Sequence, residues 1–232
     1  MSPEPRPKIG VVVFPGSNDD RDAALALEAL GAEAALVWHA AQALPDVAAV
    51  VLPGGFSYGD YVRCGAIARF APVMDAVSRF AAEGGLVLGI CNGFQVLCEA
   101  GLLPGALRPN ASLSFVCRDV GLLVGRADTA FTSRCEPEQR VTIPVKHGEG
   151  CYFADGPLLA QLEANGQIVL RYEDNPNGSI GAIAAVTNEA GNVLGLMPHP
   201  EHAVDPLLGS TDGALILGSL VDAARERVLA PA

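Results

Sequence analysis

One run near the middle of the chain, 86–95, places a cysteine between two glycines at the point where an apolar segment gives way to an amphipathic one. The apolar half predicts a buried strand, and the residues after it predict a helix. A sharp turn from strand to helix strains the backbone of the first turn residue, so its close neighbours must lack Cβ atoms. Gly89 and Gly93 meet this requirement on either side of Cys91. The run therefore predicts a nucleophile elbow with sulfur as the nucleophile, built into an α/β fold.

The elbow would expose the Cys91 sulfur above the sheet edge and set it against the start of a helix. The unpaired N–H groups and the dipole of a helix start favour a thiolate, which is the nucleophilic form of cysteine. The alternative is a small buried hydrophobic side chain, which is the usual state of a free cysteine. Other parts of the chain must decide between the two.

A second candidate group follows the apolar segment near the end of the chain, where His199 and Glu201 are separated by one proline. Residues two apart at the end of a strand point the same way. We expect His199 to take the thiol proton, and Glu201 to fix the tautomer of the ring and stabilise the imidazolium. Either residue alone would more often be structural, but together with Cys91 they predict a Cys-His-Glu triad.

A third candidate group is the glycine pair that follows the apolar run 50–52. Acyl transfer needs two N–H donors aimed at the developing oxyanion. We expect one from the backbone of Asn92, directly after the nucleophile, and the other from Gly55, whose missing side chain allows a close approach. An ordinary turn is the alternative for a Pro-Gly-Gly tripeptide.

Length and composition limit the possible classes of protein. The 232 residues, 50% of them hydrophobic, suit one large α/β domain, which we expect over 9–232 after a flexible start at 1–8. A net charge of −11 without a Lys/Arg cluster argues against nucleic acid or an anionic membrane as a partner. No apolar run reaches the roughly 18 residues that cross a bilayer, and the start lacks the apolar part of a secretion signal, so we expect a cytoplasmic protein.

The cysteines do not predict disulfides or metal. They are spread over positions 64, 91, 98, 117, 135 and 151, without a C-x-x-C pair or a Cys/His cluster at metal spacing. We expect no metal site, and we expect the five cysteines other than Cys91 to be buried or half-buried thiols. Neither a phosphate-binding loop nor a dinucleotide fingerprint is present, so we expect no cofactor on this chain.

The hydrophobic pattern predicts an open, mostly parallel sheet flanked by helices, with added antiparallel strands in the C-terminal half. In the first hundred residues we expect strands at 9–14, 34–37, 47–52 and 86–89, and helices at 20–30, 67–83 and 93–100. Beyond them we expect strands at 112–116, 120–124, 141–145, 168–172, 183–187 and 193–197, a hairpin loop at 188–192 and a last helix at 211–229. All three candidate groups end strands, where ligands bind in such folds.

Several motifs make the sequence similar to the class I, triad-type glutamine amidotransferases, whose domains are flavodoxin-like. Within this class the chain resembles the glutaminase subunits of phosphoribosylformylglycinamidine synthase. The motifs run nearly from end to end: Phe-Pro-Gly-Ser-Asn at 14–18, Gly-Gly-Phe-Ser-Tyr-Gly-Asp-Tyr at 54–61, Cys-Asn-Gly-Phe-Gln at 91–95, Asn-Pro-Asn-Gly-Ser at 175–179 and Pro-His-Pro-Glu at 198–201.

The resemblance implies that glutamine is hydrolysed to glutamate through a γ-glutamyl thioester on Cys91. The ammonia would pass to a synthetase large subunit, assisted by a small accessory subunit, that converts formylglycinamide ribonucleotide and ATP to the amidine. ATP and magnesium would bind that partner. Gly54, Gln95, Ser114 and Phe115 match substrate-binding positions of similar domains, and the alternative for Gln95 is a solvated helix residue.

Two residues depart from the pattern of the family. Asp19 stands where many relatives have cysteine, and His202 stands where many have arginine. We expect neither to touch the triad. His147 could serve the partner interface or the ammonia exit, but a loop histidine with satisfied hydrogen bonds is the favoured interpretation.

Two other functions remain open from the sequence. A cysteine hydrolase of the same fold, of the γ-glutamyl hydrolase type, would share the elbow and the histidine but would need a wider cleft and no docking partner. A non-catalytic regulatory relative would bind only glutamine or a partner. The presence of Cys91, His199 and Glu201 together argues against the second alternative.

Overall fold

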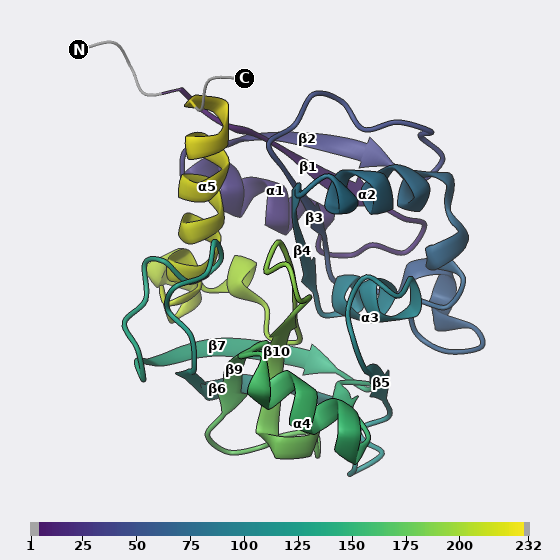
Figure 1. Ribbon diagram of the computed structural model, residues 1–232, viewed down its shortest axis with the longest axis vertical. Coiled ribbons are helices and arrows are strands. Elements are labelled where there is room, and N and C mark those ends of the chain that lie inside the picture. Colours follow the sequence, from purple (N-terminus) through teal and green to yellow (C-terminus); the bar gives the residue numbers. More distant parts are fainter. Residues whose placement is uncertain (1–4, 230–232) are drawn as a thin grey trace.

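Five parallel strands form one half of a nine-stranded central sheet, in the order β2-β1-β3-β4-β11 (Figure 1). They are β1 (Lys8–Val13), β2 (Glu33–Trp38), β3 (Ala49–Leu52), β4 (Leu86–Ile90) and β11 (Val193–Leu196). Every residue of β3, β4 and β11 is buried, because helices cover both faces of the sheet, and this is why these strands are unbroken apolar runs. This computed structural model describes residues 5–229.

Four helices cover the parallel strands (Figure 1). Helices α1 (Asp20–Ala29) and α5 (Gly213–Leu229) lie on one face, and α2 (Pro72–Ala82) and α3 (Asn92–Glu99) lie on the other. The strand order is that of a flavodoxin-like sheet, in which ligands bind beyond the carboxyl ends of the strands. The α/β fold that the sequence predicts is confirmed.

Antiparallel strands complete the sheet, as the sequence predicts. After β11 the order continues through β10 (Ile183–Thr187), β9 (Ile168–Tyr172), β6 (Val116–Val124) and β7 (Arg140–His147). The predicted hairpin loop 188–192 joins β10 to β11. It is closed by Asn188, whose Oδ1 accepts hydrogen bonds from the backbone N–H groups of Asn192 and Val193 at 3.1 Å.

The strand predicted at 112–116 is wrong. Residues 112–115 form a turn instead, in which Leu113 has a φ of 55° and its N–H donates to the Asn110 carbonyl at 2.8 Å, and only Val116 is extended, as the first residue of β6. An apolar pattern alone does not reveal this turn, because Leu113 is 84% exposed.

The helix predicted at 67–83 is split, since Pro72 disfavours helical backbone in the residue before it and opens α2 as a new helix.

Two short strands and one α-helix were not predicted. The short strands β5 (Ala106–Arg108) and β8 (Cys151–Phe153) pair with each other, and three residues are too few to show a period. Helix α4 (Gly156–Ala164) begins at an N-cap, Asp155, whose carboxylate accepts from the Leu158 N–H at 2.9 Å. Only Leu162 of α4 is buried, so its sequence carries little amphipathic pattern.

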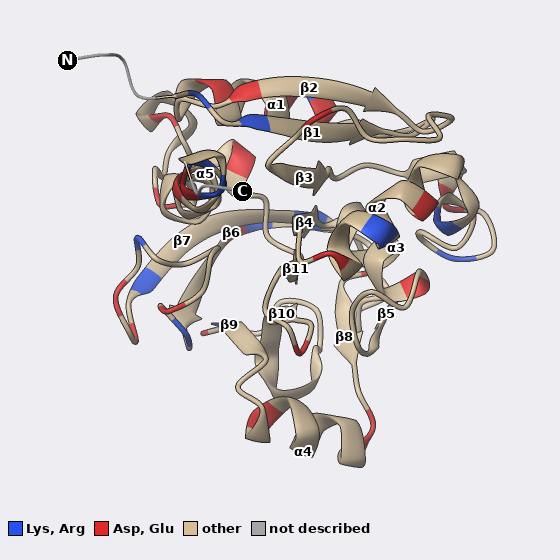
Figure 2. Ribbon diagram, turned by 45° about the horizontal axis from the view of Figure 1, so that its top comes forward, with Lys and Arg blue, Asp and Glu red and all other residues tan. Residues whose placement is uncertain are grey.

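Charged residues of both signs are mixed over the outside of the fold. Figure 2 shows Lys and Arg positions interspersed with Asp and Glu over the outer elements. Within 5–229, no helix combines the length and apolar character needed to cross a membrane. Residues 1–4 of the predicted flexible start lie outside the described residues, while Lys8 already begins β1. The single domain over 9–232 stays a prediction.

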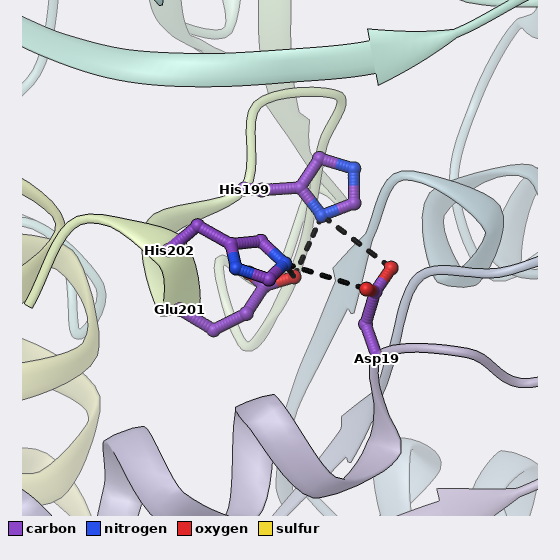
Figure 3. Close-up of side chains that lie close together, drawn as sticks. All are labelled: Asp19, His199, Glu201 and His202. Carbon is purple, nitrogen blue, oxygen red and sulfur yellow. Dashed lines mark hydrogen bonds and ion pairs between the residues drawn. The ribbon is translucent and has the colours of Figure 1, made fainter. Parts of the chain in front are cut away.

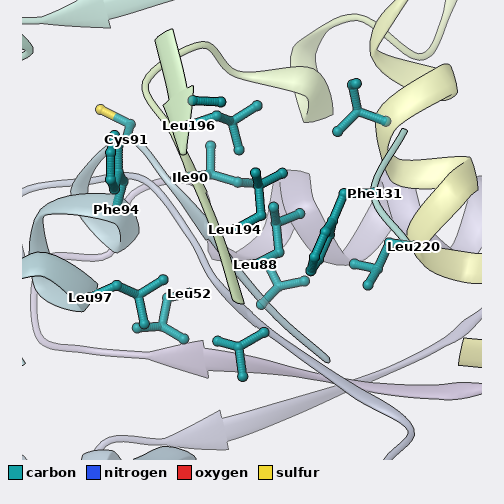
Figure 4. Close-up of a cluster of buried hydrophobic side chains, with 14 of the residues drawn as sticks. Leu52, Leu88, Ile90, Cys91, Phe94, Leu97, Phe131, Leu194, Leu196 and Leu220 are labelled. Atoms are coloured by element: carbon teal, nitrogen blue, oxygen red, sulfur yellow. The ribbon is translucent and has the colours of Figure 1, made fainter. Parts of the chain in front are cut away.

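A fully buried cluster between β4 and β11 anchors the elbow (Figure 4). Leu88 and Ile90 of β4 and Leu194 and Leu196 of β11 are each 0% exposed. Figure 4 shows Cys91 at the border of this cluster, where β4 leads into α3. The core therefore fixes the end of the strand from which the cysteine projects.

The contact between α3 and β3 gives a test of this packing. A Cβ on Gly93 would collide with the Leu52 carbonyl group, at 2.6 Å from its carbon atom. We expect Gly93→Ala to lower the free energy of unfolding by about 1–3 kcal/mol, although alanine is the better helix former. Urea denaturation measures the change.

Gly156→Ala is the matched control, because a Cβ at this first position of α4 would meet nothing within 4 Å. We expect its free energy of unfolding to stay the same or rise slightly. Equal stability of both variants would contradict the close approach of α3 to β3.

Candidate active site

Cys91 lies at the turn between β4 and α3 in a strained conformation, with φ 50° and ψ −104°. Its N–H donates to the Leu196 carbonyl at 2.8 Å, which ties the turn to β11. A Cβ on Gly89 would lie 2.7 Å from the carbonyl carbon of Gly93. The two glycines therefore pack against one another, and the sharp strand-to-helix turn that the sequence predicts is present.

The Cys91 side chain is less exposed than the sequence predicts, at 5%. Strand β7 closes over it, and the thiol lies 3.8 Å from the carbonyl oxygen of Lys146. The thiol nevertheless borders a cavity of about 220 Å³, which Gly55, Phe115 and His199 also line. A substrate would reach the sulfur through this cavity.

His199 and Glu201 form a buried pair. His199 Nδ1 lies 2.6 Å from Glu201 Oε1, and the residues are 0% and 2% exposed. They meet through a short 3-10 helix, η4 (Pro200–His202), and not through the extended strand alternation that the sequence predicts, because β11 ends at Leu196. Within 5–229, the His199 Nε2 atom has no hydrogen-bond partner, so this nitrogen is the one available to a reacting group.

The charges around His199 keep it protonated at neutral pH. Burial by itself lowers the pKa of His199, but the charges of Glu201 and of a Cys91 thiolate outweigh burial and raise the pKa to about 10. The arrangement therefore favours the imidazolium form of His199.

One candidate oxyanion donor, Asn92, lies at the elbow, and the other, Gly55, lies in the loop after β3. Gly55 lines the cavity with φ 146°, and a Cβ there would lie 2.6 Å from the backbone nitrogen of Asn18. Asn92 is the first residue of α3, where backbone N–H groups have no partner within the helix. The Asn92 side chain is engaged elsewhere, since its Oδ1 accepts from the Ser57 N–H at 3.1 Å. The oxyanion role of both backbones stays a prediction.

Gln95 is buried and lines the cavity, which excludes a solvated helix residue. It is 4% exposed, and its Nε2 donates to the Glu149 carbonyl at 2.7 Å. Its Oε1 accepts from Asn92 Nδ2 at 2.8 Å. The amide is thereby held at one wall of the cavity beside the nucleophile.

The other predicted substrate contacts differ in position. Phe115 lines the cavity and is 56% exposed, so it lies where the cavity opens to solvent. Ser114 is exposed and is not among the lining residues. Gly54 lies behind the imidazole, where a Cβ would come within 2.6 Å of His199 Cε1. The substrate roles of these residues stay predictions.

Asp19 and His202 contact the His-Glu pair, so the expectation that neither touches the triad is wrong. Asp19 Oδ2 lies 3.7 Å from His199 Nδ1, and His202 Nε2 lies 3.7 Å from Glu201 Oε1 (Figure 3). The start of α1 packs on η4, which brings together two residues 183 positions apart. No spacing in the sequence signals a contact of this kind.

Asp60, Cys64 and Glu149 are among the residues of the cavity wall that were not predicted. Burial, together with the charge of Glu149, raises the pKa of the Asp60 carboxyl. Asp60 stands inside the motif at 54–61, one of the motifs that carry the family resemblance, and its place in that motif was the available signal. Cys117 is exposed, which corrects the prediction that all five remaining cysteines are buried or half-buried.

His147 is the satisfied histidine that the sequence favours, although it ends β7 and is not in a loop. It is 3% exposed, with Nδ1 3.0 Å from Asn110 Oδ1 and Nε2 3.4 Å from Asn177 Nδ2. Burial, followed by the charge of His199, lowers the pKa of His147 to about 4. His147 is therefore neutral where His199 is charged.

One cluster offers several metal-ligand atoms. The side-chain donors of Asp19, His199, Glu201 and His202 lie within 4.8 Å of one another. The Lys146 ammonium already contacts this cluster, at 2.5 Å from Asp19 Oδ1 and 3.0 Å from His202 Nε2. Because the lysine supplies the positive charge that a metal ion would bring, we interpret the cluster as an ion-pair network. The absence of a metal site stays a prediction.

The sequence profile of a protein family identifies the class of protein. The profile described as the CobB/CobQ-like glutamine amidotransferase domain matches residues 6–212. This match agrees with a cysteine elbow beside a His-Glu pair at the carboxyl edge of a parallel sheet. The class is that of the glutamine amidotransferases.

Comparison with individual relatives shows which family within this class the chain belongs to. The chain is 61% identical over 218 residues to the phosphoribosylformylglycinamidine synthase subunit PurQ of Rubrobacter xylanophilus, covering 94% of this chain and 99% of the relative. It is 57% identical over 225 residues to the PurQ subunit of Salinibacter ruber, covering 93% and 96%. A solved structure of PurLQS from Thermotoga maritima superimposes with a TM-score of 0.87 at 45% identity, covering 94% of this chain and 98% of that one. The chain therefore belongs to the family of the PurQ subunits of phosphoribosylformylglycinamidine synthase.

The pKa values of the two buried histidines, His199 and His147, are shifted in opposite directions, and NMR can measure both. We expect ring-nitrogen NMR to show His199 as an imidazolium at neutral pH, losing its proton only near pH 10, and His147 as a neutral ring that gains a proton near pH 4. Glu201→Gln removes a charge 2.6 Å from the ring, so we expect it to lower the pKa of His199 by roughly one unit or more. A His199 ring that is neutral at neutral pH in the unaltered protein would contradict this electrostatic account.

Proposed function

We propose that this chain is the glutaminase subunit of a phosphoribosylformylglycinamidine synthase. It hydrolyses L-glutamine to glutamate and ammonia, and the ammonia feeds a synthetase subunit that converts formylglycinamide ribonucleotide and ATP to formylglycinamidine ribonucleotide in purine biosynthesis. The observation that carries the proposal is the position of Cys91, at a strained elbow that lines the same cavity as His199, whose ring is paired with the buried Glu201.

Acylation uses the thiolate and the imidazolium together. The Cys91 sulfur attacks the side-chain amide carbon of glutamine, and the carbonyl electron pair moves onto oxygen. Backbone N–H groups of Gly55 and Asn92 stabilise this oxyanion, and loss of one such donor typically costs about 2.7–4 kcal/mol. The C–N bond then breaks as His199 Nε2 donates its proton to the leaving nitrogen. The products are ammonia and a γ-glutamyl thioester.

Deacylation uses the now neutral imidazole as a base. His199 takes a proton from water, and the hydroxide attacks the thioester carbon through a second oxyanion at the same donors. The C–S bond breaks, which returns the thiolate and releases glutamate. Throughout both steps Glu201 holds the Nδ1–H of the ring at 2.6 Å, so Nε2 faces the reacting atoms.

The cavity suits a small zwitterionic substrate. Its volume of about 220 Å³ is below the usual range of drug-sized pockets, roughly 300–1,000 Å³. Asp60 and Glu149 add carboxylates to its wall, which complement the ammonium group of an amino acid. A hydrolase of longer γ-glutamyl substrates needs a wider cleft, so this observation favours free glutamine.

Partners complete the reaction. We propose that the chain binds a synthetase large subunit and a small accessory subunit, and the similarity to a chain of the PurLQS structure from Thermotoga maritima supports this assembly. ATP and magnesium then bind the synthetase subunit, while this chain works without a cofactor. The sequence supports that division, because it contains no phosphate-binding loop.

A cytoplasmic location fits this function. All six cysteines are free thiols, which is the normal state in a reducing compartment. We therefore propose that the chain acts in the cytoplasm.

Replacement of the nucleophile separates the glutaminase from the synthetase. In the reconstituted complex we expect Cys91→Ala to reduce glutamine-dependent synthesis at least about a thousandfold, because no thioester can form. Synthesis from added ammonium salt should stay within about twofold, since the synthetase subunit does not use the cysteine. Formation of the amidine product, with either nitrogen source, measures both activities.

Cys117→Ala is the matched control, because this thiol is exposed on β6. Both activities should be unchanged. Loss of the ammonium-dependent reaction in Cys91→Ala would show a structural role for Cys91, and full glutamine-dependent activity in this variant would overturn the proposed function.

A further inference from the structure

Asp19 does not cap the helix that it precedes, although aspartate is a common N-cap residue. It occupies the N-cap of α1, where an aspartate side chain usually accepts a hydrogen bond from the first turn of the helix. The Asp19 side chain makes no such bond. Its own N–H instead donates to the Gly54 carbonyl at 3.2 Å, and the residue is 3% exposed. A buried carboxylate that leaves its cap free must be satisfied by something else.

The Asp19 carboxylate points toward His199 and His202 (Figure 3). Oδ1 lies 2.5 Å from Lys146 Nζ and 3.3 Å from His202 Nε2, while Oδ2 lies 3.7 Å from His199 Nδ1. Glu201 Oε1 approaches the same Nδ1 atom at 2.6 Å. One nitrogen of the catalytic imidazole therefore faces two carboxylates.

Gly54 makes this arrangement possible. A Cβ on Gly54 would lie 2.5 Å from Asp19 Oδ2 and 2.6 Å from His199 Cε1. Any side chain there would push the carboxylate and the ring away from the loop. The glycine before the oxyanion donor thus creates the space in which Asp19 and His199 face each other.

We propose that Asp19 is a positioning residue of the glutaminase reaction: a second buried carboxylate that holds His199 as an imidazolium, with its own charge balanced by Lys146. This inference rests on the proposed function. Burial raises the pKa of Asp19, but contacts with His202 and Lys146 and the charge of His199 outweigh burial and lower it well below its usual range. The carboxylate is therefore ionised at neutral pH.

Charged and titratable groups face His199 from each element packed against it. They are Cys91 at the elbow, Asp19 at the start of α1, Lys146 and His147 at the end of β7, and Glu201 and His202 in η4. Asp19 and Lys146 are the pair whose charges can be changed without altering the nucleophile, the base or the carboxylate nearest to the base.

Two substitutions should move the alkaline limb of the pH profile in opposite directions. Asp19→Asn removes a negative charge beside the imidazolium, so His199 loses its proton at lower pH. Lys146→Met leaves the Asp19 charge unbalanced, so His199 keeps its proton to higher pH. We expect the alkaline limb of the kcat/KM profile to move to lower pH by roughly one unit in Asp19→Asn. Even at the dielectric constant of water, removal of a unit charge at this separation changes a pKa by about this amount.

The measurement is glutamate release by the reconstituted complex as a function of pH, with the rate of Cys91 alkylation by iodoacetamide as a second readout that needs no turnover. Asp20→Asn is the matched control, because it removes the same charge one residue further along, where the carboxylate accepts a hydrogen bond from the Arg21 N–H. We expect the Asp20→Asn profile to coincide with that of the unaltered complex.

The outcomes separate this inference from the proposed function. Opposite shifts in Asp19→Asn and Lys146→Met, with no shift in Asp20→Asn, support it. An alkaline limb that stays in place in Asp19→Asn, in a complex that still hydrolyses glutamine, overturns the inference alone. Shifts of the same sign in both variants overturn it as well, because a general loosening of the site would cause them. An unaltered complex that releases no glutamate overturns the proposed function itself.

Discussion

The strained turn at Cys91 is the constraint on which the rest of the site depends. A residue other than glycine with φ 50° and ψ −104° is held only where its surroundings leave no alternative. Here the surroundings are the parallel core strands, the hydrogen bond from Cys91 to Leu196, and the close approach of Gly89 to Gly93. The same packing that stabilises the middle of the sheet thereby aims one sulfur atom at the cavity, and any change that relaxes the turn would withdraw it.

Several charged side chains are buried close to this turn, where removing an ion from water costs free energy. His199, Glu201 and Asp19 are all nearly inaccessible to solvent, so each ion is tolerated only because the others are close. Lys146, which is partly exposed, connects the network to the surface. A buried network of this kind holds the imidazole in one orientation, which the proposed reaction requires because His199 first donates and then accepts a proton at the same nitrogen.

Much of this could be predicted from the sequence, because the strongest signals are local. Apolar runs revealed the core strands β1, β3, β4 and β11, and the glycines around Cys91 revealed the elbow. What the sequence did not reveal depends on contacts made through space. Asp19 meets His202 only after the start of α1 packs on η4, and the cysteine is covered only because β7, from the far edge of the sheet, curves back over it. Short or weakly amphipathic elements such as β5, β8 and α4 were also not predicted, since they carry too few buried side chains to show a hydrophobic period.

In the proposed reaction Cys91 is the one thiol of the six that attacks a glutamine side chain. Labelling with a glutamine-analogue electrophile, followed by peptide mass analysis, tests this role. We expect one adduct per chain, on Cys91, that forms more slowly in Glu201→Gln and is suppressed by excess glutamine. An adduct on the exposed Cys117 in place of Cys91, or no adduct that glutamine competes with, would contradict it.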